Sequence, residues 1–141
     1  MYRMIGIGHD RGFEIMLGLR EGYGAYREKV THTADDVIAA HHDWQRTMGH
    51  VQGIVVTECR LSYGWPVVDG VIHGADEPAC MVSGNINILY DGSLTDQEGQ
   101  ERIVSLAAHL ADALKQTRVY VRYNGYSLVL HREGAETPTG D

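Results

Sequence analysis

The chain has 141 residues, of which 43% are hydrophobic and 22% charged, and its formal net charge is −7 at neutral pH. A chain of this length forms one domain with its own core and needs neither disulfides nor a metal for stability. The negative charge argues against binding to duplex nucleic acid, and no apolar run approaches the roughly 20 residues that cross a membrane. The glycine-rich start does not fit a signal peptide. We therefore expect a soluble, cytoplasmic domain over residues 1–132 and a disordered tail over residues 133–141.

The first half of the chain predicts two strands, a capped helix and a third strand. Residues 1–8 are apolar and lead through a turn to residues 13–19, where large apolar and mostly polar side chains alternate. Thr33 and Asp36 have the spacing of a capping box, and apolar residues then recur at helical period. Residues 54–63 alternate again, which predicts a strand with one packed face.

The second half predicts an irregular segment, a strand, a second helix and a hairpin. Residues 64–79 are rich in glycine and proline and are expected to form the longest irregular segment, of the kind that serves as a lid or a partner contact. Within it, the Asp69-Gly70 pair favours a small hairpin over residues 67–72. Residues 80–90 alternate as a strand. Thr95 and Glu98 form a second capping box at the start of a long amphipathic helix. Residues 118–131 then contain two short strands around an Asn-Gly turn, which is a strong hairpin signal.

This order of elements predicts an α+β domain. Strand, helix, strand, strand, helix, strand is the split β-α-β order of a ferredoxin-like sandwich, here with an extra strand at each end. Both helices would cover one face of an antiparallel sheet. Polar side chains would gather on the uncovered face: Glu14, Arg20, Glu58, Arg60, Asn85, Asn87, and either Tyr120 with Arg122 or their neighbours. A slip of one residue in register would reverse each such assignment.

No metal, cofactor or nucleophile signature is present. Adjacent His41 and His42 would point about 100° apart on a helix, whereas a two-histidine site needs spacing of three or four, and His41 falls on the apolar stripe with Trp44. We expect His41 to be a core residue. Cys59 and Cys80 lie in predicted strands, outside any C-x-x-C pair, and are expected to be reduced and buried. The glycines match no phosphate-binding loop, and no serine elbow occurs.

Two carboxylates offer an acid–base alternative. Glu14 and Glu58 fall on the same predicted sheet face, and neighbouring carboxylates can take different pKa values and share acid and base roles. Arg20 and Arg60 fall on that face too, so cross-strand ion pairing is the simpler interpretation.

Two classes of function follow. The first is a non-catalytic protein, expected to be a homo-oligomer, that uses the uncovered sheet face and residues 64–79 for self-association or to bind a small anionic, nucleotide-like ligand. The ligand-binding residues would be Arg20, Glu58, Arg60, Asn85, Asn87, Tyr120 and Arg122. The alternative is a small enzyme that needs no cofactor, a hydrolase, isomerase or lyase, with a glutamate as acid or base and an arginine holding the substrate.

Overall fold

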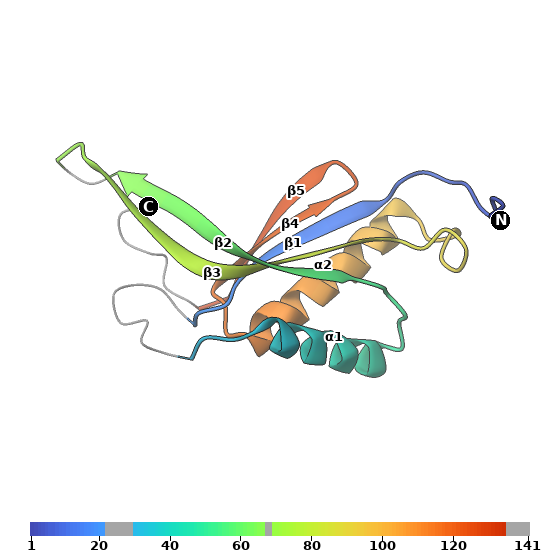
Figure 1. Cartoon of the computed structure of the whole chain (residues 1–141), viewed down its shortest axis with the longest axis horizontal. Helices are drawn as coiled ribbons and strands as arrows, with labels where there is room; N and C mark the ends of the chain where they lie inside the picture. The colour runs from blue at the N-terminus through green and yellow to red at the C-terminus, as the bar shows by residue number, and fades with distance from the viewer. Residues whose placement is uncertain (22–29, 67–68, 135–141) are drawn as a thin grey trace.

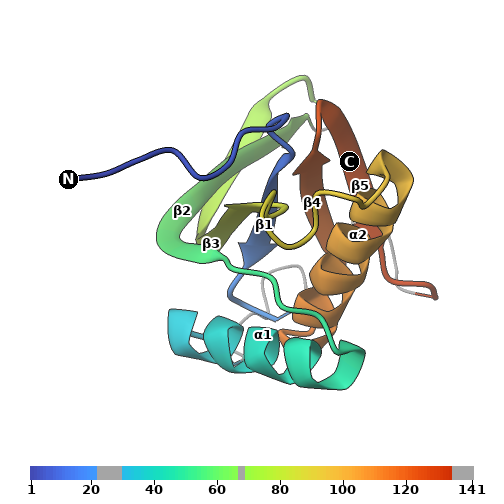
Figure 2. The ribbon, with the colours of Figure 1, turned by 90° about the vertical axis from the view of Figure 1, so that its right-hand side faces the viewer.

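Five antiparallel strands form one sheet, and two helices cover one of its faces (Figures 1 and 2). We describe residues 1–21, 30–66 and 69–134 of a computed structural model of the chain. The elements are β1 (Gly12–Gly18), α1 (Ala34–Met48), β2 (Val55–Pro66), β3 (Ile72–Asn85), α2 (Asp96–Ala113), β4 (Arg118–Tyr123) and β5 (Tyr126–His131). The strand order β2-β3-β1-β4-β5 confirms the predicted ferredoxin-like α+β class, with β5 as the extra C-terminal strand.

The expected N-terminal strand is not formed. Residues 1–11 are extended but pair with no other strand, and the sheet begins at Gly12. The predicted tail begins at residue 133, and its residues 135–141 lie outside the described part of the chain. Within the described residues, no helix is both long enough and apolar enough to cross a membrane.

Both predicted capping boxes are present. At the start of α1, Thr33 Oγ1 accepts a hydrogen bond from the Asp36 amide at 3.3 Å, while the Asp36 carboxylate accepts one from the Thr33 amide at 2.9 Å. Thr95 and Glu98 repeat this exchange at the start of α2, with distances of 3.1 and 3.0 Å. These reciprocal bonds satisfy amides that a helix leaves free at its N-terminus, so the local sequence fixes where each helix begins.

The core lies between the sheet and the two helices. Phe13, Ile15 and Leu17 of β1 point toward the helices and are almost fully buried. From α1, Trp44 and His41 pack into the same layer, and His41 forms a 2.6 Å hydrogen bond with the Gln52 carbonyl oxygen. The prediction that His41 is a core residue is confirmed.

Residues 64–66 and 72–79 are strand and not loop, so the prediction for them is wrong, while residues 67–68 lie outside the described part of the chain. The strand residues belong to a long β2–β3 hairpin in which Gly64 pairs with Gly74 and Pro66 with Ile72 (Figure 1). Pro78 is tolerated inside β3 because its carbonyl oxygen faces the β1 side and accepts from Leu19. The nitrogen and oxygen of one residue point the same way in an antiparallel strand, so the missing N–H takes nothing from the β2–β3 ladder.

Candidate functional site

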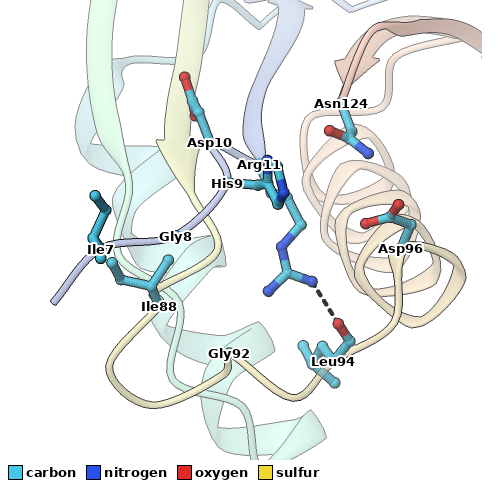
Figure 3. A pocket seen from close by; sticks show the side chains of 10 residues that line it. All are labelled: Ile7, Gly8, His9, Asp10, Arg11, Ile88, Gly92, Leu94, Asp96 and Asn124. Atoms are coloured by element: carbon cyan, nitrogen blue, oxygen red, sulfur yellow. Dashed lines mark hydrogen bonds between the residues drawn. The ribbon is translucent and has the colours of Figure 1, made fainter.

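A cavity of about 590 Å³ lies at the end of the sheet where β1 begins (Figure 3). Four chain segments meet there: the stretch that precedes β1, the β3–α2 connection, the first turn of α2 and the β4–β5 turn. Ile7 and Ile88 lie together at one side, while Asp96 and Asn124 lie at the other. The lining residues are Ile7, Gly8, His9, Asp10, Arg11, Ile88, Gly92, Leu94, Asp96 and Asn124.

Arg11 holds the β3–α2 connection in place. Its guanidinium is buried and donates to the carbonyl oxygens of Leu94 at 2.6 Å and Asp91 at 3.2 Å (Figure 3). The Asp91 side chain in turn pairs with Arg102 at 3.0 Å. Because charged donors to buried carbonyl groups form the stronger class of hydrogen bond, this arginine acts as a structural clip in the wall of the cavity.

A second cavity, of about 480 Å³, adjoins the first on the sheet face that carries no helix, which we call the open face. Asp10 and Asn124 line both cavities, so the two form neighbouring parts of one site. Glu14 and Arg122, opposite each other on β1 and β4, line the second cavity with their charged atoms 3.6 Å apart. Their side chains are 47% and 76% exposed, so this ion pair is weak and free to exchange for contacts to a ligand.

The site is acidic with an apolar corner. Three carboxylates line the two cavities, Asp10 and Asp96 in the first and Glu14 in the second, against two arginines, Arg11 and Arg122. The guanidinium of Arg11 is directed at backbone carbonyl groups. Carboxylates accept hydrogen bonds from hydroxyl and ammonium groups and attract cations. Volumes of this order are typical of pockets for small organic molecules. The arrangement suits a ligand with an apolar part, hydroxyl groups and positive charge.

The open face carries some of the residues predicted for it. Glu14 pairs with Arg122 across β1 and β4, and Tyr120 lies on the same face two residues earlier. Of the two registers left open for β4, the one that exposes Tyr120 and Arg122 is therefore confirmed. Asn85 lines the second cavity at the end of β3.

Two of the predicted residues lie on the opposite face of the sheet. Val55 pairs with Ser83, which is itself opposite Glu14, so odd-numbered residues of β2 share the open face and even-numbered ones do not. Glu58 thus points toward the helices, where its carboxylate accepts from the Ala34 amide at 3.4 Å. Arg60 pairs with Asp76. The predicted grouping of Glu14 with Glu58 is wrong, and with it their shared acid–base role.

The reason for the error lies in the composition of β2. The odd-numbered set, which includes Val55, Cys59 and Leu61, is the more apolar, and so it was expected to pack in the core. In the structure only Val56, opposite Val82, packs against the core from this strand. Cys80 is buried as predicted, but Cys59 is exposed on the open face, so that half of the cysteine prediction is wrong.

Two further predicted residues lie away from both cavities. Arg20 follows β1 and forms an isolated bridge with Thr31, and its carbonyl oxygen accepts from Gln116 at 2.7 Å. Asn87 belongs to the turn after β3, where its side chain accepts from the Leu89 amide at 2.9 Å. Neither lines the site.

Sequence reasoning missed the acidic residues at the centre of the site. Asp10 falls in the turn predicted before residue 13, and no prediction was made for Asp96, which follows the capping residue Thr95. A usable signal existed, because the split β-α-β order places the start of β1, the start of α2 and the β4–β5 turn at the same end of the sheet. Polar residues at those three points converge. Among the described residues, no three His, Cys, Asp or Glu side chains are grouped so that they would hold a metal ion.

Comparison with solved structures finds two that share this architecture. A phage SAM lyase in complex with S-methyl-5′-thioadenosine superimposes with a TM-score of 0.71 over 96% of this chain and 99% of its own, at 19% sequence identity. A phage SAM lyase in its apo state gives the same TM-score over 96% and 100%, at 18% identity. No protein-family model and no curated protein sequence matches the chain. The likeness establishes a shared ferredoxin-like fold.

Proposed function

We propose that the protein is a lyase that binds S-adenosylmethionine (SAM) and cleaves it to S-methyl-5′-thioadenosine. The observation that carries this proposal is the fold shared with phage SAM lyase over nearly the full length of both chains. A lyase is among the cofactor-independent enzymes predicted from the sequence as the alternative to a non-catalytic binding protein.

The two-part cavity complements this substrate. SAM carries a positive sulfonium, an amino acid group with both charges and a nucleoside with two ribose hydroxyl groups. Asp10 and Asp96 would attract the sulfonium and accept from the hydroxyl groups, beside the apolar corner formed by Ile7 and Ile88. The amino acid group would lie in the second cavity.

Glu14 and Arg122 supply the matching charges for that amino acid group. A carboxylate and a guanidinium on neighbouring strands, 3.6 Å apart, can exchange their mutual pairing for an ammonium and a carboxylate of the ligand. The proposed substrate is therefore a cation, in place of the anionic ligand that the arginines led us to expect.

Cleavage of this substrate needs no cofactor, and at most one side chain that acts as a base. The bond between sulfur and the γ-carbon breaks, and its electron pair moves to sulfur, which leaves as a neutral thioether. The γ-carbon then forms a new bond in one of two ways. The substrate's own carboxylate attacks it and closes a lactone, or a base removes a β-proton and the electron pair of that C–H bond forms an alkene. Lactone closure needs orientation of the substrate and no protein base, whereas elimination needs a carboxylate such as Glu14 near the β-carbon.

Incubation of the purified protein with SAM tests the proposal. We expect chromatography to show S-methyl-5′-thioadenosine, with a lactone or an unsaturated amino acid as co-product. These two co-products have the same mass, and proton NMR distinguishes them because only the unsaturated amino acid has vinyl protons. Asp10→Asn should lower kcat/KM by at least about tenfold through loss of charge at the cavity, while Asp35→Asn, on the first turn of α1, should leave it unchanged. If no thioadenosine is released and neither SAM nor the thioadenosine raises the melting temperature, the proposal is wrong.

A further inference from the structure

Four polar side chains form one row across the sheet, on the wall of the second cavity. Glu14 of β1 lies opposite Ser83 of β3 on one side and opposite Arg122 of β4 on the other, and Arg122 lies opposite Ser127 of β5. All four line the second cavity. Directly opposite residues in an antiparallel sheet project from the same face, with Cβ atoms about 4.5–5.5 Å apart. The sheet therefore presents a hydroxyl, a carboxylate, a guanidinium and a second hydroxyl in that order.

The next row along the same strands is apolar. Two residues further from the cavity, Met81, Met16, Tyr120 and Val129 lie opposite one another in the same strand order. The polar row is therefore a local feature of the end of the sheet where the two cavities meet. A face that was polar only because it met solvent would not change character from one row to the next.

The guanidinium of Arg122 has donors available for a ligand. It lies 3.6 Å from the Glu14 carboxylate, beyond the roughly 2.7–3.2 Å of an N–H···O hydrogen bond, and it makes no hydrogen bond with the described residues. Arg11, the other arginine of the site, donates to the carbonyl oxygens of Leu94 and Asp91. Arg122 is thus the arginine of this site that can bind a carboxylate through two parallel hydrogen bonds.

We propose that the polar row binds the α-amino acid group of SAM and makes the protein select ligands that carry an α-carboxylate. The inference rests on the proposed function, because it takes an adenosyl ligand whose amino acid group lies in the second cavity. Arg122 binds the carboxylate with the Ser127 hydroxyl beside it, and Glu14 accepts from the ammonium with Ser83 beside it. Both ligand charges are attached to one carbon, which suits two opposite charges on neighbouring strands.

Net charge alone predicts the opposite preference. Three carboxylates against two guanidinium groups line the two cavities, so the site as a whole attracts cations. Removal of the α-carboxylate makes an adenosyl ligand more positive by one charge, and a site that acted through net charge would bind such a ligand more tightly. In the proposed arrangement, Arg122 then has no carboxylate to bind and lies beside a ligand of its own charge, so the decarboxylated ligand binds more weakly.

Two thioethers test this selection without being cleaved. S-adenosylhomocysteine is SAM without the methyl group on sulfur, and its decarboxylated analogue also lacks the α-carboxylate. Neither carries a sulfonium, so the sulfur cannot leave as a neutral thioether. Titration calorimetry should show at least about tenfold tighter binding of S-adenosylhomocysteine, which is the low end of what a hydrogen bond to a charged group contributes. Equal affinities, or tighter binding of the decarboxylated analogue, would overturn the inference.

Arg122→Gln isolates the contribution of the guanidinium. It should weaken binding of S-adenosylhomocysteine by at least about tenfold and reverse the preference between the two thioethers. Binding of S-methyl-5′-thioadenosine, which has no amino acid group, should stay the same. Glu14→Gln should weaken binding of both thioethers, because each keeps the ammonium. Arg46→Gln on α1 is the matched control, since Arg46 is 73% exposed against 76% for Arg122, and it should change none of these affinities.

The measurements separate this inference from the proposed function. If Arg122→Gln leaves the preference unchanged, or weakens S-methyl-5′-thioadenosine as much as S-adenosylhomocysteine, Arg122 does not bind the carboxylate, whether or not SAM is cleaved. If the wild type does not cleave SAM but prefers S-adenosylhomocysteine and loses this preference in Arg122→Gln, the lyase is refuted and the amino acid site stands. If neither thioether nor the thioadenosine binds, both proposals are wrong.

Discussion

Replacing Gly99 of α2 with alanine is predicted to destabilise the fold as long as Tyr123 keeps its hydroxyl group. The residue lies on the buried side of the helix, directly over the end of β4. A Cβ atom added at position 99 would overlap the Tyr123 phenol oxygen and would lie 3.0 Å from the ring carbon that carries it. The tyrosine is 1% exposed and cannot move away without opening the core.

The expected cost follows from two opposing terms. Alanine is favoured over glycine inside a helix by about 1 kcal/mol. Overpacking a rigid core costs typically 1–3 kcal/mol, and an overlap with a buried ring belongs at the upper end. We therefore expect Gly99→Ala to lower the free energy of unfolding by about 2 kcal/mol.

A double-mutant cycle tests the cause. The Tyr123 hydroxyl makes no hydrogen bond of good geometry with the described residues. Burial raises the pKa of the phenol, and a weak interaction with the nearby Arg11 opposes this rise. Tyr123→Phe should then change stability by less than about 1 kcal/mol, because no bond is lost. In that background Gly99→Ala should cost almost nothing, which gives a coupling of about 2 kcal/mol in urea titrations followed by circular dichroism. An equal cost of Gly99→Ala in both backgrounds would refute the argument.

Three further predictions concern groups in or near the site and the core. Arg11→Met should lower the free energy of unfolding by about 2–3 kcal/mol, because two buried carbonyl groups lose a charged donor, whereas Arg46→Met on the exposed side of α1 should change it by less than about 0.5 kcal/mol. A thiol reagent at mildly alkaline pH should label Cys59 at once and Cys80 only after unfolding, since burial raises the pKa of Cys80 to about 11; labelling of both in the native state would contradict this. Burial lowers the pKa of His41 in the folded state, so its contribution to stability is present above the ordinary histidine pKa of about 6.5 and is lost as pH falls through it. His41→Gln should weaken the fall in unfolding free energy between about pH 7.5 and pH 5.5, and an unchanged pH dependence would count against this role.

Local sequence patterns predicted the fold wherever the signal was self-contained. The capping boxes at Thr33 and Thr95 each place two groups three residues apart, and the Asn-Gly turn at residue 124 adopts the left-handed backbone that such turns require, with φ values of 49° and 86°. These features depend on neighbours in the chain. No distant contact was needed to find them.

The length of the β2–β3 hairpin could not be predicted in the same way. The Asp69-Gly70 pair indicates its turn, but pairing partners decide how far the two strands extend. Gly64, Pro66 and Gly74 each indicate a break when considered alone, yet each finds a partner across the hairpin. The face of β2 is also decided elsewhere: only residues near Val56 lie over the core, and beyond them the strand extends past the helices. An amphipathic pattern carries no information about where the covering layer ends.

The proposed substrate is a cation, whereas the sequence led us to expect an anionic ligand, and this difference suggests a final experiment. A sequence shows that arginines are present but not that Arg60 pairs with Asp76 and that Arg20 lies away from both cavities. Of the arginines predicted to bind the ligand, Arg122 lines the site, together with Asp10, Glu14 and Asp96. SAM is a cation and S-methyl-5′-thioadenosine is neutral, so added salt should weaken binding of SAM and leave binding of the thioadenosine nearly unchanged. Titration calorimetry at low and high ionic strength measures both, with Asp10→Asn expected to flatten the salt dependence for SAM. Equal salt dependence for the two ligands would show that the carboxylates do not act through their charge.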